Sequence, residues 1–128
     1  MSLEQISTHT APAAIGPYSQ AIAANGWVAT SGQIGMDPQS GEIVKGGVEA
    51  QAQQALANLA AVLSEAQSDL ALVMKTTLYL IDMNDFAAVN EVYARVFGDA
   101  RPARSTVAVC ALPKGALFEI DALALKRS

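Results

Sequence analysis

An arginine and a glutamate near the end of the chain are of the residue types that could bind a small carboxylate and move a proton on it. They are Arg104 and Glu119. A planar guanidinium can hold a carboxylate through two parallel hydrogen bonds without losing its charge. A glutamate can take a proton from water and return it to a leaving group. A plain cross-strand ion pair would use the same two residues, and the residue types alone leave both interpretations open.

Two strand-like segments carry this pair. Residues 105–111 and 117–125 are rich in β-forming side chains, and a Leu-Pro-Lys-Gly turn separates them. This pattern predicts a hairpin. With the turn centred between Pro113 and Lys114, Thr106 would pair with Asp121 and Ala108 with Glu119. The period of two would then gather four side chains on one face. These four are Arg104, Thr106, Glu119 and Asp121.

The first part of the chain contains turn signals and one helical stripe. A weak strand signal covers residues 3–8, and Asn25-Gly26 between residues 19–24 and 27–31 predicts a tight hairpin. Residues 33–47 read as a turn-rich loop with a possible short strand at 42–44. Apolar residues then recur at helical spacing from 48 to 66, which predicts a long amphipathic helix on a sheet.

A strand and a second helix follow. Residues 73–81 are rich in β-formers and apolar on both faces, which predicts a central strand. Asp82 or Asn84 could cap the next helix, and Gly98 suits its end. The order predicts an α+β fold with both helices on one face of a mixed sheet. The exposed face would then meet water or, given the apolar composition, another subunit.

Composition narrows the class of protein. The chain has 128 residues, which predicts one domain spanning 1–128, and 52% are hydrophobic while 16% are charged. The mean hydropathy is +0.27, yet no apolar run reaches the roughly 18 residues of a membrane helix. We therefore expect the excess apolar surface to lie in subunit contacts. The net charge of −4 argues against nucleic acid as a main partner. The lack of a long apolar run argues against a membrane as a partner.

Soft and imidazole ligands are scarce. Cys110 and His9 are the single cysteine and histidine, whereas a transition-metal site needs three or four such groups. The sequence therefore predicts no metal site. It also predicts no internal disulfide, and the start of the chain lacks a signal-peptide pattern, so we expect a cytoplasmic protein.

Five short motifs in order resemble one known family. They are Gly16-Pro17-Tyr18, Thr30-Ser31-Gly32-Gln33, Val73-Met74-Lys75-Thr76-Thr77, Asp85-Phe86 with Asn90, and the stretch from Arg101 through Leu112-Pro113-Lys114 to Glu119-Ile120. The chain from about residue 11 to 127 resembles the Rid family, also called YjgF-type proteins, the reactive enamine/imine deaminases. The resemblance implies a chorismate-mutase-like fold and a homotrimer with a central barrel and three intersubunit sites. It further implies cofactor-free hydrolysis of short 2-imino acids to 2-oxo acids and ammonia.

The resemblance also implies roles for individual residues. It makes Arg104 the carboxylate-binding residue and Glu119 the residue that activates water. Burial would raise the pKa of Glu119 and a nearby Arg104 would lower it, and the sequence leaves the balance open. The family's remaining substrate-binding positions fall on Tyr18, Ser31, Gly32, Asn90 and Thr106.

Position 106 departs from the family pattern. Many members have a cysteine there, two residues past the arginine, whereas this chain has Thr106. The lone Cys110 is not its equivalent. Because water is the implied nucleophile, the backbone N–H at position 106 could still hold the substrate.

Two other functions are compatible with the same sequence. One is a binding protein that uses the same cleft to sense a small carboxylate such as a 2-oxo acid. The other is an RNA-cleaving inhibitor of translation, a label that the family has carried. The acidic composition and the single histidine argue against the RNA-cleaving alternative.

Overall fold

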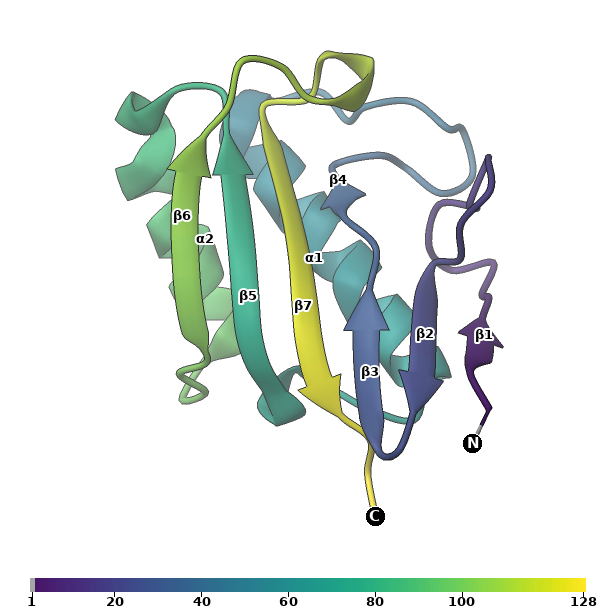
Figure 1. Cartoon of the computed structure of the whole chain (residues 1–128). Helices are drawn as coiled ribbons and strands as arrows, with labels where there is room; N and C mark the ends of the chain where they lie inside the picture. The colour runs from purple at the N-terminus through teal and green to yellow at the C-terminus, as the bar shows by residue number, and fades with distance from the viewer. Residues whose placement is uncertain (1) are drawn as a thin grey trace.

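One mixed β-sheet with two helices accounts for most of the molecule (Figure 1). The computed structural model describes residues 2–128. Its elements are β1 (Glu4–Ile6), β2 (Ala21–Ala24), β3 (Trp27–Thr30), β4 (Gln33–Ile34), α1 (Gly47–Glu65), β5 (Val73–Leu80), α2 (Phe86–Phe97), β6 (Ala103–Ala108) and β7 (Phe118–Leu125). Short 3-10 helices precede β5 (Leu70–Leu72), α2 (Met83–Asp85) and β7 (Pro113–Gly115). The strand order is β1-β2-β3-β7-β5-β6, and β4 also pairs with β7.

The hairpin predicted at Asn25-Gly26 is confirmed. β2 and β3 pair antiparallel with Ala24 opposite Trp27. Asn25 and Gly26 both have positive φ, 53° and 79°, as a two-residue turn with the twist of its strands requires. β1 adds to this hairpin along β2. The possible strand at 42–44 is reduced to one isolated bridge between Met36 and Ile43.

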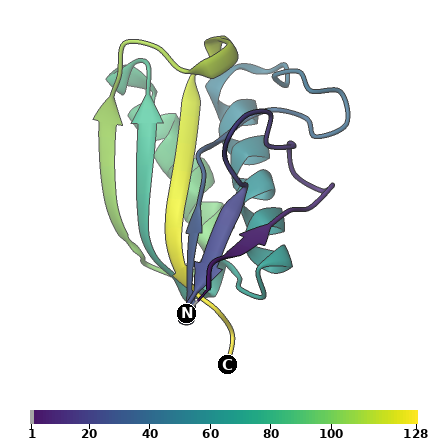
Figure 2. The same ribbon diagram turned by 45° about the vertical axis from the view of Figure 1, so that its right-hand side comes forward.

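Both predicted helices form, and they cover the same face of the sheet (Figures 1 and 2). α1 buries a stripe of small and branched side chains that includes Leu56, Leu59 and Leu63. α2 buries Val89, Val92, Tyr93 and Phe97 and ends at Gly98, which has a φ of 62°. The Asp82 side chain caps a short 3-10 helix just before α2, where it accepts a hydrogen bond from the Asn84 N–H at 2.9 Å.

The hairpin predicted for residues 105–125 does not form. β6 pairs in parallel with β5, and β5 lies between β6 and β7. Thr106 is opposite Leu78, and Asp121 is opposite Thr77, so the predicted pairing of Thr106 with Asp121 is wrong. The physical reason is that α2 is a crossover long enough to bring β6 parallel to β5. The chain then returns over the end of the sheet and places β7 on the other side of β5 (Figure 1).

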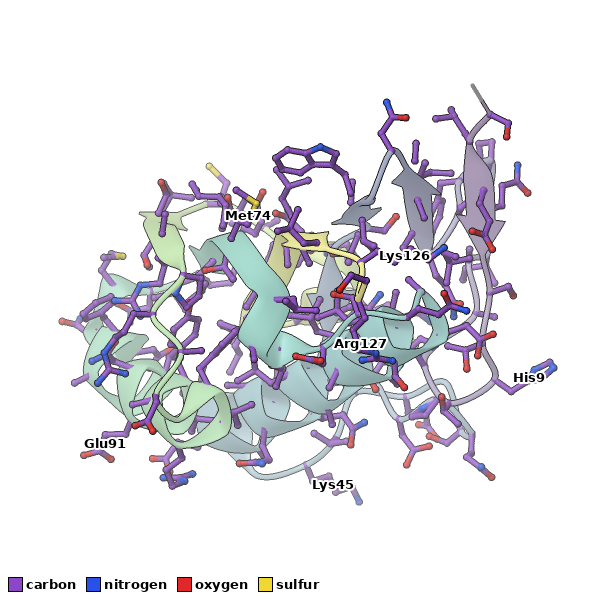
Figure 3. The ribbon with its side chains drawn as sticks, turned by 90° about the horizontal axis from the view of Figure 1, so that it is seen from below. His9, Lys45, Met74, Glu91, Lys126 and Arg127 are labelled. Carbon is purple, nitrogen blue, oxygen red and sulfur yellow. The ribbon has the colours of Figure 1, made fainter. Side chains whose placement is uncertain are left out.

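The two faces of the sheet have different surroundings. The face under the helices is the core and buries Leu78, Leu80, Phe118 and Ile120 completely. The open face exposes large apolar side chains, among them Trp27 at 42% and Val107 at 42%. In Figure 3, Met74 projects from the sheet on the side away from the helices. Among residues 2–128, no helix has the length and apolar character needed to cross a membrane.

Candidate functional site

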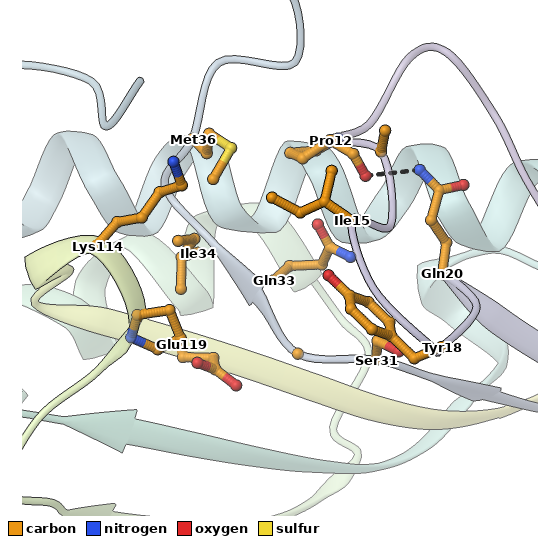
Figure 4. A pocket seen from close by; sticks show the side chains of 13 residues that line it. Pro12, Ile15, Tyr18, Gln20, Ser31, Gln33, Ile34, Met36, Lys114 and Glu119 are labelled. Carbon is orange, nitrogen blue, oxygen red and sulfur yellow. Dashed lines mark hydrogen bonds between the residues drawn. The ribbon is translucent and has the colours of Figure 1, made fainter. Parts of the chain in front are cut away.

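Glu119 lies at the edge of a cavity of about 390 Å³ (Figure 4). It is on the open face of β7, since its neighbours Phe118 and Ile120 point into the core. The cavity is lined by residues of the N-terminal loop, the β3–β4 bend and the 3-10 helix before β7. These residues include Ile15, Tyr18, Ser31, Gly32, Met36, Pro113 and Lys114. The structure thus brings four of the sequence-predicted residues together: Tyr18, Ser31, Gly32 and Glu119.

Gly32 leaves the space that the Glu119 carboxylate occupies. A Cβ built on Gly32 would overlap a carboxylate oxygen of Glu119 and lie 2.7 Å from its Cδ. Real Cβ atoms do not approach other atoms this closely, so a larger residue would push the carboxylate away. The glycine in the Ser-Gly-Gln bend therefore allows the carboxylate to lie against the backbone.

A buried amide holds the loop that carries Tyr18. The Gln20 amide donates to the carbonyls of Pro12 at 2.7 Å and Thr8 at 3.1 Å, and its oxygen accepts from the Thr8 N–H at 2.7 Å. The Ser31 hydroxyl donates to the Ser19 carbonyl at 2.6 Å, so Ser31 is bonded to the loop as well as exposed to the cavity. The Tyr18 ring is 53% exposed at the rim.

Two further buried amides reach the cavity walls from α1. The Asn58 amide donates to the carbonyls of Ile34 at 3.1 Å and Met36 at 2.9 Å. The Gln51 side chain accepts from the Leu117 N–H at 2.8 Å. Side chains of α1 therefore hold the backbone around β4 and the backbone just before β7 through hydrogen bonds. The sequence placed these polar residues mostly off the apolar stripe, and no local pattern signalled that they bind backbone elsewhere.

Arg104 lies in a second depression, on the α2 side of the sheet. Its guanidinium donates to the Asn90 side-chain oxygen at 2.9 Å. The guanidinium carbon lies 4.8 Å from the ring centre of Tyr93 and 5.4 Å from that of Phe86. Tyr93 is itself fixed by a 2.9 Å hydrogen bond shared with Thr76. A cavity of about 500 Å³ lies here, lined by Asn90, Tyr93, Ala94, Phe97, Ala100, Arg101, Pro102 and Arg104.

Arg104 and Glu119 lie on opposite faces of the sheet. Arg104 pairs with Thr76, which is buried under α2, and Thr106 pairs with Leu78 on the same side. Glu119 pairs with Tyr79, whose neighbours Leu78 and Leu80 are buried. The expectation that one face carries Arg104, Thr106, Glu119 and Asp121 is therefore wrong. Side chains alternate along a strand, so the registers of β6 and β7 on the intervening β5 determine on which face of the sheet each side chain lies.

The carboxyl of Glu119 has a perturbed acidity. Burial raises its pKa above the usual value, and the negative charge of Asp121 raises it further. Arg104 does not counteract this within one chain, since it lies on the other face. Burial also raises the pKa of Tyr93, although its bond with Thr76 and the charge of Arg104 act in the opposite direction. A pocket carboxyl whose pKa is raised in this way is suited to both accepting and donating a proton.

The single cysteine and the single histidine lie away from both cavities. Cys110 is exposed beyond β6, and in Figure 3 His9 points outward from the N-terminal segment. Within residues 2–128, no group of three or more His, Cys, Asp or Glu side chains could hold a metal ion.

Comparisons with known proteins agree with the fold and the motifs. A family model described as Endoribonuclease L-PSP matches residues 8–126. The 2-iminobutanoate/2-iminopropanoate deaminase of Mus musculus is 51% identical over 121 residues, which cover 94% of this chain and 90% of that protein. A RutC family protein of Synechocystis is 54% identical over 98% of both chains.

Solved structures match across nearly the whole chain. The Rid family protein YyfA of Yersinia pestis has a TM-score of 0.94 at 46% identity and covers 97% of this chain and 99% of its own. TdcF of E. coli, solved with bound serine, has a TM-score of 0.92 at 41% identity and covers 97% of this chain and 99% of its own. With sequence, motifs and fold in agreement over residues 8–126, the chain belongs to the Rid family, whose family model is the one described as Endoribonuclease L-PSP.

Proposed function

We propose that this protein hydrolyses short 2-imino acids, such as 2-iminopropanoate and 2-iminobutanoate, to 2-oxo acids and ammonia. Relatives about half identical to the chain carry the name 2-iminobutanoate/2-iminopropanoate deaminase. The two cavities supply the groups that such a reaction needs. These groups are a cation for the substrate carboxylate and a carboxyl that exchanges protons.

In the proposed reaction, Arg104 binds the carboxylate and aligns the adjacent C=N carbon. A water molecule attacks that carbon while Glu119 accepts its proton, and Glu119 then gives the proton to the nitrogen, which leaves as ammonia. The raised pKa of Glu119 favours this double role. Tyr18 and Ser31 would orient the water or the nitrogen at the rim, and Asn90 would orient the Arg104 guanidinium. The Gly32 backbone and the N–H at Thr106 would complete the substrate contacts.

The observation that carries the proposal of a site shared between subunits is the placement of Arg104 and Glu119 on opposite faces of one sheet. They can act on one small substrate only if Arg104 of one chain approaches the Glu119 cavity of another. We propose that a homotrimer brings them together, with the open faces of the three sheets forming its central barrel. The exposed apolar side chains of the open face, including Trp27, Met74 and Val107, support this association because they need a cover.

Mixed assemblies test the shared site. Arg104→Ala and Glu119→Gln would each remove one essential group, so each variant alone should be nearly inactive as a deaminase. If they are dissociated and reassembled together at equal amounts, random mixing in a ring gives each site about a one in four chance of having both groups. The expected result is recovery to about a quarter of the wild-type rate of ammonia release from freshly generated 2-iminobutanoate. If the mixture stays as inactive as its parents while exchange of subunits is verified, the intersubunit site is wrong.

A further inference from the structure

A row of polar side chains on the open face of β5, β6 and β7 is not explained by either cavity. The Tyr79 hydroxyl donates to Asp121 Oδ2 at 2.8 Å. Lys75 Nζ donates to Thr77 Oγ1 at 3.3 Å and to Ser105 Oγ at 3.2 Å. The row begins at Glu119, since Tyr79 is directly opposite Glu119 in the β5–β7 ladder.

The register places the Tyr79–Asp121 bond immediately beside Glu119. Asp121 lies two residues after Glu119 on the same face of β7, and it is opposite Thr77 rather than Tyr79. Tyr79 therefore reaches its acceptor diagonally, within the range that long side chains cover between neighbouring strands. The phenol fixes the carboxylate of Asp121 at a defined place along β7, next to the carboxylate that the proposed reaction uses.

The electrostatics agree with this geometry. The negative charge of Asp121 acts on Glu119 and raises its pKa, in addition to the larger effect of burial. The hydrogen bond between Tyr79 and Asp121 is also the largest of the causes that raise the pKa of Tyr79 to about 12. The phenol therefore keeps its proton at any ordinary working pH and stays a donor.

We propose that Asp121, held by Tyr79, is a positioning residue that makes Glu119 a stronger base. This inference rests on the proposed function, in which Glu119 takes a proton from water. A fixed negative charge opposes ionisation of a neighbouring carboxyl group. When the acid is harder to ionise, its carboxylate binds a proton more strongly. Neither Tyr79 nor Asp121 needs to touch the substrate for this effect.

Other charged or titratable groups face Glu119 from the elements around it. Tyr79 and, further along the row, Lys75 belong to β5, and Tyr18 and Lys114 line the cavity from the N-terminal loop and the 3-10 helix before β7. From the β3–β4 side, the adjacent residues are Ser31, Gly32 and Ile34, none of which is charged. Among these described neighbours of Glu119, Asp121 is the one carboxylate, so its replacement removes a single negative charge.

The test is Asp121→Asn, which keeps the shape of the side chain and an oxygen for the Tyr79 hydroxyl but removes the charge. The deaminase activity of the intact assembly is measured as kcat/KM against pH. On the acidic side of this profile, kcat/KM falls as Glu119 becomes protonated. This fall should occur at lower pH in the variant. The ratio of kcat/KM at low pH to its plateau should rise by about two- to fivefold. Glu65→Gln is the matched control, because Glu65 is exposed at the end of α1 and its loss removes one charge elsewhere.

A second measurement needs no substrate. Carbon-13 NMR of protein labelled at glutamate carboxyls follows the titration of Glu119, whose signal is assigned by its absence in Glu119→Gln. Its midpoint should fall in Asp121→Asn and stay in place in Glu65→Gln. An unchanged midpoint in Asp121→Asn overturns the proposal. If the wild type has no deaminase activity, the proposed function fails, but this titration still decides whether Asp121 acts on Glu119.

Tyr79→Phe tests whether the tyrosine works through the aspartate. It removes the hydrogen bond and keeps the ring. Its effect on the Glu119 titration should be clear in the wild-type background and largely absent in the Asp121→Asn background, since the two residues form one unit. If the two substitutions instead shift the titration independently and additively, Tyr79 does not act through Asp121. The proposal that the two residues act on Glu119 as one unit is then wrong.

Discussion

The Glu119 cavity and the Arg104 depression treat their charged residues in opposite ways. Around Glu119, burial and the neighbouring Asp121 both oppose the charge of the carboxyl. Around Arg104, an amide oxygen and the faces of two aromatic rings favour the positive charge. In the proposed reaction, this difference suits Glu119 to accepting and donating a proton, and Arg104 to orienting an anion as a permanent cation.

The largest effect should come from the residue whose charge is opposed. Glu119→Gln removes the proposed base and acid with almost no change of shape. We expect kcat/KM for 2-iminobutanoate to fall by about 10² to 10⁴-fold, the usual contribution of general acid–base catalysis. The measurement is ammonia release against the spontaneous background. A variant with near wild-type turnover would show that Glu119 is not the proton carrier.

The Arg104 depression should lose almost as much activity when its cation is removed. Arg104→Ala removes the proposed bidentate contact and the alignment that it gives, at a cost of about 3 to 5 kcal/mol in kcat/KM. Arg104→Lys keeps the charge but not the fork of donors, so much of the loss should remain. Steady-state kinetics and the assembly size of both variants are the readouts. Full rescue by lysine would favour a simple charge over a carboxylate clamp.

Gly32→Ala tests the shape of the Glu119 cavity without changing any charge. The added Cβ would overlap the Glu119 carboxylate, and the flexible glutamate should swing aside. We expect about a 10 to 100-fold loss in kcat/KM, since small displacements of a catalytic group are costly, with little change in Tm. The matched control is the same substitution in the Glu119→Gln background, where it should cost little more. A full additional loss there would assign Gly32 a separate role.

The two regions should also differ in how they affect stability. The pKa of Glu119 is raised in the folded state, so the unfolded chain ionises first as pH rises. Folding stability from this residue is therefore present at low pH and lost as pH rises through its unfolded and then its folded pKa. Glu119→Gln should accordingly unfold at a higher temperature than the wild type at pH 7, and the gain should shrink towards pH 4. A lower Tm of Glu119→Gln at pH 7 would contradict a raised pKa of Glu119 in the folded state.

The smallest effect should come from position 106. Thr106→Cys restores the residue that many family members have, but the proposed reaction uses the backbone there and water as nucleophile. Deaminase activity should stay within about tenfold, or about 1.4 kcal/mol in barrier. A change of several hundredfold in either direction would show that the side chain takes part in the chemistry.

Much of this protein could be predicted from local sequence. The Asn25-Gly26 turn, the apolar stripe of α1, the central strand β5 and Gly98 at the end of α2 each follow from short-range geometry, and all four are confirmed. The types of the candidate groups, an arginine and a glutamate near strand segments, were also visible. These features depend on neighbours within a few residues, which the sequence states directly.

The tertiary structure alone decided which of these groups meet. The sequence suggested a local hairpin joining Arg104 to Glu119, whereas α2 carries β6 to the far side of β5 and the two residues face opposite ways. The amides of Gln20, Gln51 and Asn58 likewise bind backbone far along the chain. Strand order and such long-range bonds depend on how whole elements pack against one core. No short stretch of sequence contains that information, because the pairing partner and the register are set by the burial of every strand at once.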